Sequence, residues 1–124
     1  MIFNLDMSSE TPIYIQIRNQ IVLGIGQGRL LLGEALPTVR QMAEDIGVNH
    51  MTVNKAYQIL KAEGYIEIDR RHGAKVVEHQ KNDEEYKEYL KDKMELAAAE
   101  AKAHGLDLQE FMEYCIRAFG ATSV

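Results

Sequence analysis

The sequence contains few of the residues that crosslink a chain, interrupt its helices or place it in a membrane. Its 124 residues include one cysteine, two prolines and no tryptophan. The single cysteine, Cys115, cannot form an internal disulfide, which is typical of the reducing cytoplasm. No hydrophobic run approaches the roughly 20 residues that span a bilayer, and the N-terminus lacks the features of a signal peptide. We therefore expect a cytoplasmic protein with no membrane partner.

Charge is distributed unevenly along the chain. The net charge is −5, which by itself disfavours binding to a polyanion. Residues 1–77 contain 8 Lys and Arg against 8 Asp and Glu, whereas residues 78–124 contain 6 against 11. All of the net acidity therefore lies in the last third of the chain. Because the local surface decides affinity, a nucleic-acid interface is expected in the first part only.

Two short helices joined by a tight turn are expected between residues 38 and 63. An earlier helix is predicted to start at Thr11-Pro12, with Thr11 as its N-cap, and a loop is predicted over residues 28–37. Thr38 and Gln41 then match a capping box, Gly47 is a helix stop, and Asn49 is a second N-cap. Apolar residues follow at helical spacing: Val39, Met42, Ala43 and Ile46, then Val53, Ala56, Tyr57 and Leu60. This pattern is typical of a helix-turn-helix.

The hydrophobic period changes after Gly64. Residues 65–69 and 74–77 alternate as β-strands do, and the basic segment 70–73 lies between them, which predicts a β-hairpin, or wing. A short polar linker is expected from His79 to Asp83, followed by a long helix over about 83–104. A last helix is expected to start near Asp107, where Asp107 and Glu110 match a second capping box. We predict a mainly α fold with a small β-hairpin wing: a winged helix-turn-helix domain over residues 1–78, then a two-helix tail over residues 79–124.

The segment from Pro12 to Val77 resembles the winged helix-turn-helix of GntR-type bacterial regulators. Several ordered blocks carry the resemblance: residues 12–17, 28–29 with 33–34, 36–40, 47–57, 60–64 and the wing glycine, Gly73. The short two-helix tail is similar to that of the YtrA branch of this family. The resemblance implies a regulator, often a repressor of a nearby operon that encodes a transporter, with a tail that serves dimerisation.

Candidate DNA contacts lie in three places. The resemblance implies DNA contact by Arg40, whose guanidinium can bind phosphate or a guanine edge. The exposed face of the third helix carries short polar groups that suit a major groove, and the basic wing tip suits a narrow minor groove. The predicted DNA-binding residues are Thr38, Arg40, Asn49, His50, Met51, Thr52, Asn54, Lys55, Arg70, Arg71, His72 and Gly73. Many family members have arginine at the positions of His50 and Asn54, so a more asparagine-led, A·T-tolerant specificity is expected.

The tail carries an apolar stripe that two helices cannot bury alone. A matching tail of a second copy is the simplest partner. The predicted dimer-interface residues are Tyr86, Leu90, Met94, Ala97, Ala101, Leu108, Phe111, Met112 and Phe119. We expect double-stranded operator DNA and a second copy of the chain as partners.

No enzyme or metal site is expected. The four histidines and Cys115 do not follow a zinc-ligand spacing, and Cys115 is interpreted as a buried structural thiol. No cofactor is expected; a small-molecule effector is left open, with the junction of tail and winged domain as its candidate place. The alternative function is a winged helix that binds another protein without reading a DNA sequence. Exposed Met51 favours that alternative, whereas the polar helix face and basic wing favour DNA.

Overall fold

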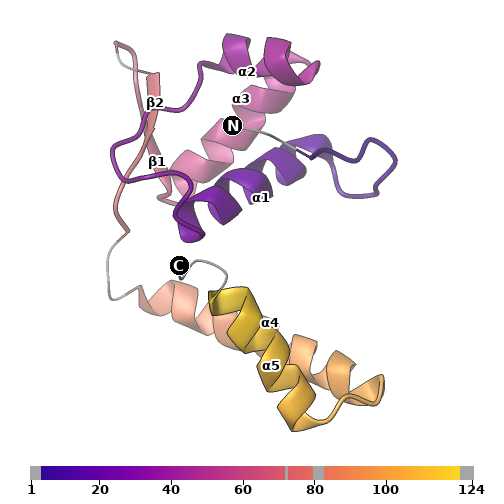
Figure 1. Ribbon diagram of the computed structural model, residues 1–124. Coiled ribbons are helices and arrows are strands. Elements are labelled where there is room, and N and C mark those ends of the chain that lie inside the picture. Colours follow the sequence, from indigo (N-terminus) through magenta and orange to yellow (C-terminus); the bar gives the residue numbers. More distant parts are fainter. Residues whose placement is uncertain (1–3, 72, 80–82, 121–124) are drawn as a thin grey trace. The chain divides into compact units, whose positions relative to one another are not determined.

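The computed structural model describes residues 4–71, 73–79 and 83–120. Within these residues the chain forms five helices and one two-stranded antiparallel sheet (Figure 1). The elements are α1 (Ile13–Gly26), α2 (Val39–Ile46), α3 (His50–Ala62), β1 (Ile66–Asp69), β2 (Gly73–Val76), α4 (Glu84–Ala103) and α5 (Leu108–Gly120). They divide into two compact units, residues 1–79 and 80–124. The predicted order of three helices, a hairpin wing and two further helices is confirmed.

Local caps set the limits of the helices in the first unit. The Thr38 hydroxyl accepts a hydrogen bond from the Gln41 backbone N–H at 3.0 Å, so α2 begins directly after Thr38. The Gln41 side chain does not reach back as a capping box requires; it donates to Asp45 Oδ1 at 2.8 Å. At α1 the expected cap by Thr11 is also wrong, because the N-cap position is occupied by Pro12, which makes no side-chain cap.

The turn between α2 and α3 follows from Gly47 and Asn49. Gly47 adopts the left-handed conformation with φ 72°, which ends α2 and which side chains rarely adopt. Two residues later, Asn49 Oδ1 accepts a hydrogen bond from the Met51 backbone N–H at 2.7 Å and so caps α3. The three residues between the helices thus stop one and start the next, as the sequence predicted.

One hydrophobic core holds the first unit together. Buried residues of α1, α2, α3 and the hairpin meet in a single cluster that includes Ile17, Met42, Tyr57, Leu60 and Val76. The buried positions of α3 lie on one face of the helix, which leaves the opposite face to solvent. Packing of α1 and α2 against that buried face therefore fixes which residues of α3 point outward.

A third extended segment completes the wing. The hairpin pairs Ile66 with Val76 and Asp69 with Gly73. The outer edge of β2 is also paired, because the segment of residues 33–36 runs along it. Its bonds are Gly33 N to Val76 O at 2.8 Å, Val76 N to Glu34 O at 2.9 Å and Leu36 N to Ala74 O at 2.8 Å. This part of the predicted loop is therefore strand-like, and it ties the wing to the start of α2.

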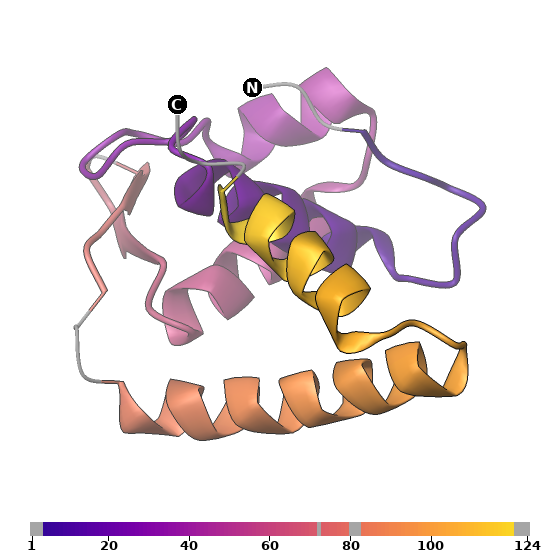
Figure 2. The same cartoon turned by 60° about the horizontal axis from the view of Figure 1, so that its bottom comes forward.

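The second unit consists of α4 and α5. Asp83 caps α4 by accepting from the Tyr86 backbone N–H at 2.9 Å, and Gly105 follows its C-terminal end with φ 91°. The expected capping box at α5 is present: Asp107 Oδ1 accepts from the Glu110 N–H at 2.9 Å, and Glu110 Oε1 accepts from the Asp107 N–H at 3.4 Å. Figure 2 shows α5 turning back from the end of α4. No described residue of this unit is buried.

Candidate nucleic-acid interface

The starts of α2 and α3 and the turn of the hairpin lie on the same side of the first unit (Figure 1). On this side the hydrogen bond from the Tyr57 hydroxyl to Pro37 O, at 2.6 Å, joins α3 to the residue before the α2 cap. Tyr57 is buried, and burial raises the pKa of its phenol above the ordinary value of 10.0. The neutral phenol is thus kept as a donor that positions α2 against α3.

We expect Tyr57→Phe to lower the free energy of unfolding by about 1 kcal/mol, the usual net value of one such bond. The pKa of the Tyr57 phenol is higher in the folded state than in the unfolded state. Its contribution to the free energy of unfolding is therefore complete below about pH 10 and is lost as the pH rises further. The variant should lack that alkaline decline. Urea unfolding between pH 7 and 11 measures both effects. Tyr14→Phe is the control, since no hydrogen bond to that hydroxyl occurs among the described residues; an equal loss there would contradict the role of Tyr57.

Arg40 lies in the first turn of α2 with its side chain exposed. Within the described residues its guanidinium has no hydrogen bond and no ion pair. Thr38 is exposed too; its hydroxyl oxygen accepts the cap bond, which leaves its proton free to donate. The start of α2 therefore presents a free cation and a hydroxyl donor.

The start of α3 presents most of the predicted residues to solvent. His50, Met51, Asn54 and Lys55 are exposed, and Thr52 is half-buried. Asn49 is exposed as well, but its Oδ1 is engaged in the helix cap. A bidentate pair with adenine needs both the oxygen and the nitrogen of an amide. Within this cap only the Nδ2 of Asn49 is free, so Asn54 is the better placed amide for adenine.

Lys55 is held by a residue that the sequence did not connect with it. Its Nζ lies 4.0 Å from the centre of the Tyr14 ring in α1, a cation–π contact. The contact holds the ammonium against the Tyr14 ring of α1. No local pattern could have identified this pair, because it depends on how α1 crosses α3.

The wing tip is basic and exposed. Arg70 and Arg71 are both exposed, and the Arg71 backbone N–H donates to Asp69 Oδ1 at 2.8 Å, which shapes the turn. Gly73 has φ 71°, so a side chain there would be strained. His72, also predicted to contact DNA, lies outside the described residues. The tip therefore carries two cations, and the absence of a side chain at Gly73 allows its backbone to approach a partner closely.

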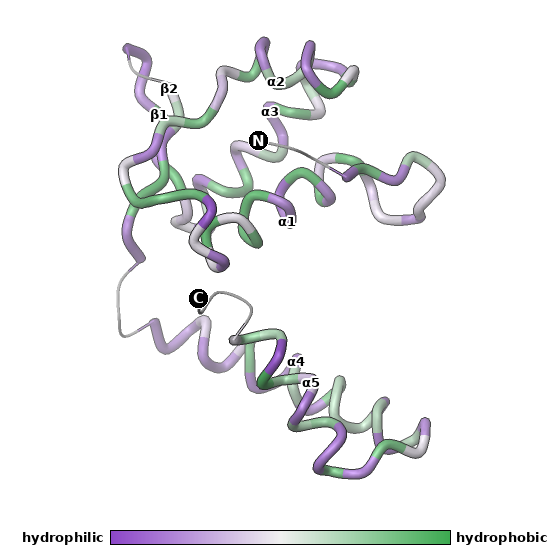
Figure 3. The backbone as a smooth tube through the Cα atoms, in the orientation of Figure 1, coloured by the Kyte–Doolittle hydropathy of each residue, from purple (hydrophilic) through white to green (hydrophobic). Residues whose placement is uncertain are grey.

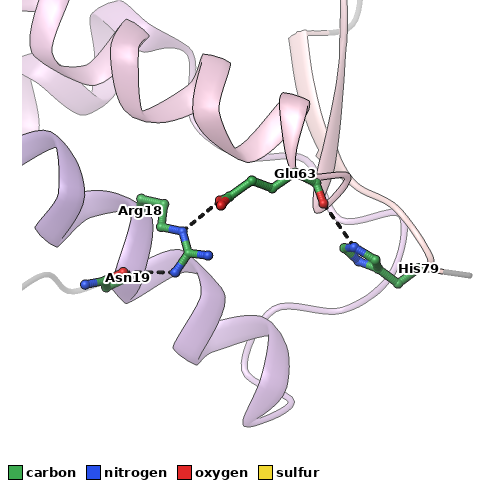
Figure 4. A network of polar contacts seen from close by, with 4 residues as sticks. All are labelled: Arg18, Asn19, Glu63 and His79. Atoms are coloured by element: carbon green, nitrogen blue, oxygen red, sulfur yellow. Dashed lines mark hydrogen bonds and ion pairs between the residues drawn. The ribbon is translucent and has the colours of Figure 1, made fainter. Parts of the chain in front are cut away.

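A polar cluster joins α1, the end of α3 and the last residue of the first unit (Figure 4). Arg18 Nε lies 2.9 Å from Glu63 Oε1, and His79 Nε2 is 3.0 Å from Glu63 O. The His79 ring also packs on Tyr65, with ring centres 4.7 Å apart. The sequence had placed His79 at the start of a polar linker; its contacts instead bind it to the first unit.

The predicted interface residues of the tail are exposed or half-exposed in the single chain. Green segments mark hydrophobic residues along α5 in Figure 3. Phe119 is the most exposed large hydrophobic residue of this helix, with 87% of its surface accessible to solvent. A hollow of about 300 Å³ lies between α4 and α5. It is lined by Ala98, Ala101, Lys102, Leu106, Asp107, Leu108 and Phe111. Cys115 is half-buried rather than fully buried in the single chain.

No group of three or more His, Cys, Asp or Glu residues among the described residues could hold a metal ion. None of the described helices is both long and apolar enough to cross a membrane.

Residues 13–76 match the GntR family of bacterial regulatory proteins. The chain belongs to this family, and it is a transcriptional regulator. It is similar over most of its length to YtrA, an HTH-type transcriptional repressor of Bacillus subtilis. The two sequences are 34% identical over a region that covers 89% of this chain and 86% of YtrA. The prediction of a GntR-family regulator of the YtrA type is thus confirmed. The relatives are regulators, so the expectation that the chain is not an enzyme is also confirmed.

Solved structures agree with this assignment. YtrA from Sulfolobus acidocaldarius matches 80% of this chain and 99% of its own, with 36% identity and a TM-score of 0.68. A structure described as a transcriptional antiterminator from Listeria monocytogenes matches 97% of this chain and 94% of its own, with 27% identity and a TM-score of 0.83. The DNA-binding domain of AraR in complex with operator ORE1 matches 62% of this chain and 94% of its own, with 26% identity and a TM-score of 0.53.

Proposed function

We propose that the chain is a cytoplasmic repressor that binds an inverted-repeat operator in double-stranded DNA as a homodimer. The observation that carries the proposal is the exposed start of α2, where Arg40 has no partner among the described residues, together with the exposed start of α3 and the basic wing tip on the same side of the unit. AraR, whose domain has the same fold, is solved with an operator. Arg40, Thr38 and the wing arginines would supply phosphate contacts, and residues of α3 would contact base edges.

The exposed tail supports the homodimer. An isolated pair of helices with no buried residue has little to stabilise it, whereas a second copy would cover the stripe that Met112 and Phe119 share. The acidic charge of residues 78–124 also suits a part that stays away from DNA. Two copies of α3, related by a two-fold axis, would then enter successive major grooves. The family resemblance favours an operon that encodes a transporter as the target.

One observation favours a second function. Met51 is 79% exposed at the start of α3, and exposed apolar side chains are typical of protein-binding surfaces. A winged helix that docks onto another protein would use this residue as a contact point. The same position in a DNA complex would instead face the floor of the major groove.

Selection of the purified protein against a random duplex library at near-physiological salt tests the proposal. We expect enrichment of an inverted repeat whose half-sites are centred about 10 base pairs apart, or a multiple of that spacing. Such a repeat would support both sequence reading and two-fold symmetry. Binding that is weak, equal on all sequences and lost as salt rises would contradict the proposal and favour the protein-binding alternative.

A further inference from the structure

Met51 is the most exposed large hydrophobic side chain among the described residues of the first unit. It lies in the first turn of α3, on the face opposite the buried residues Val53, Tyr57 and Leu60. Its surroundings on that face are polar: Asn54 lies three residues further along the helix and Gln58 seven, and both are exposed. The hydrophobic core therefore gives no reason for an apolar residue at this position.

The backbone of Met51 is held firmly in place. Its N–H donates to Asn49 Oδ1 at 2.7 Å in the helix cap. The side chain thus begins from a fixed point, while the flexible thioether can adapt to the surface it meets. The other long side chain nearby, Lys55, is drawn towards the Tyr14 ring, with its Nζ 4.0 Å from the ring centre. Met51 is then the longest side chain that projects freely from the first turn of α3.

The base edges in a major groove are polar with one exception. They present hydrogen-bond donors and acceptors, and only thymine adds an apolar group, its 5-methyl. The N-terminal residues of a recognition helix are the ones that contact base edges. The thymine 5-methyl is therefore the one group on the base edges against which an exposed, flexible apolar side chain at that position can pack.

We propose that Met51 specifies a thymine in each half-site by packing its thioether and terminal methyl against the thymine 5-methyl group. This inference rests on the proposed function, since it requires that α3 enter the major groove. It also gives a role in DNA reading to the one residue that otherwise favours a protein partner. Asn54, three residues along the same face, would contact a neighbouring base by hydrogen bonds.

Substitution of deoxyuridine for thymine provides the test, because it removes only the 5-methyl group. Each thymine of the selected operator is replaced in turn, symmetrically in both half-sites, and the dissociation constant is measured by fluorescence anisotropy. At one position the wild-type protein should lose affinity about fourfold per half-site, the effect expected for one buried methyl group. Met51→Gln and Met51→Ala should bind the thymine and deoxyuridine operators equally.

Leu32→Gln is the matched control. Leu32 is 61% exposed but lies in the segment between α1 and α2 and not on α3, so this variant should keep the wild-type sensitivity to deoxyuridine. Circular dichroism checks that each variant is folded. A wild-type protein indifferent to every deoxyuridine substitution would overturn the inference, as would Met51 variants that keep the full loss.

The two failures are distinguishable. If the selection yields no operator, the proposed function fails and the role of Met51 in DNA reading fails with it. If an operator is selected but no thymine methyl depends on Met51, only the present inference is overturned. If Met51→Gln binds the thymine operator as tightly as the wild-type protein does, Met51 does not contact the bases and the inference is overturned.

Discussion

Arg40→Ala is expected to remove specific operator binding while the protein stays folded and dimeric. The guanidinium is exposed, and no described residue pairs with it, so its loss should not disturb the fold. A bidentate contact to phosphate or guanine is worth about 1–3 kcal/mol, and a symmetric dimer makes it twice. Affinity for the selected operator should therefore fall roughly 30-fold to more than 1,000-fold. Fluorescence anisotropy at near-physiological salt measures the loss.

Arg29→Ala is the matched control for this prediction. Arg29 is exposed in the loop after α1, where its Nη2 donates to Gln27 Oε1 at 2.6 Å, and it lies outside the proposed interface. Its removal takes the same charge from the same unit and should change affinity only slightly. Unchanged operator affinity in Arg40→Ala would place the start of α2 outside the interface. Loss of folding or of the dimer together with DNA binding would show that Arg40 is a structural residue.

A chain that ends at His79 is expected to be folded, monomeric and weak in DNA binding. Every described hydrophobic residue that is buried lies between Ile17 and Val76, so the first unit keeps its core. His79 is retained because it contacts Glu63 and Tyr65. Without the tail the two half-sites are bound independently, and affinity for the whole operator should fall by roughly 100-fold to 10,000-fold. Sedimentation velocity and anisotropy measure the two effects.

A pair of full-length variants separates loss of the interface from loss of the tail as a whole. Met112→Glu introduces a charge on the apolar stripe of α5, whereas Gln109→Glu introduces the same charge beside it. Only the former should shift the sedimentation of the protein towards the monomer. If the truncated chain remains dimeric, the tail is not the interface, and the stripe must be covered by something other than a second copy.

Much of the fold could be predicted because its determinants are local. The caps by Thr38, Asn49 and Asp107 join residues only two or three positions apart, and Gly47 ends α2 by its own backbone conformation. The change of period after Gly64 is likewise visible over a few residues. Such signals do not depend on the rest of the chain, and the structure has them where the sequence placed them.

Contacts between distant segments could not be predicted in this way. Leu36 hydrogen-bonds to Ala74, and Lys55 packs on Tyr14; the members of each pair lie about forty residues apart in sequence. Each pair forms only because the core brings its elements together. The Gln41 side chain has two local partners within reach, the Thr38 backbone N–H and the Asp45 carboxylate. Sequence alone does not decide between them.

The division of α3 into two faces has a consequence for how such regulators diversify. Val53, Ala56, Tyr57 and Leu60 hold the helix in the core, whereas Met51 and Asn54 take no part in that packing. After gene duplication, a copy can exchange its outward residues at little cost in folding and acquire a new set of target genes. Substitution of the inward residues, by contrast, would disturb the packing of the core, so these positions can change little. Paralogous regulators in one cell can thus share the same fold and yet bind different promoters.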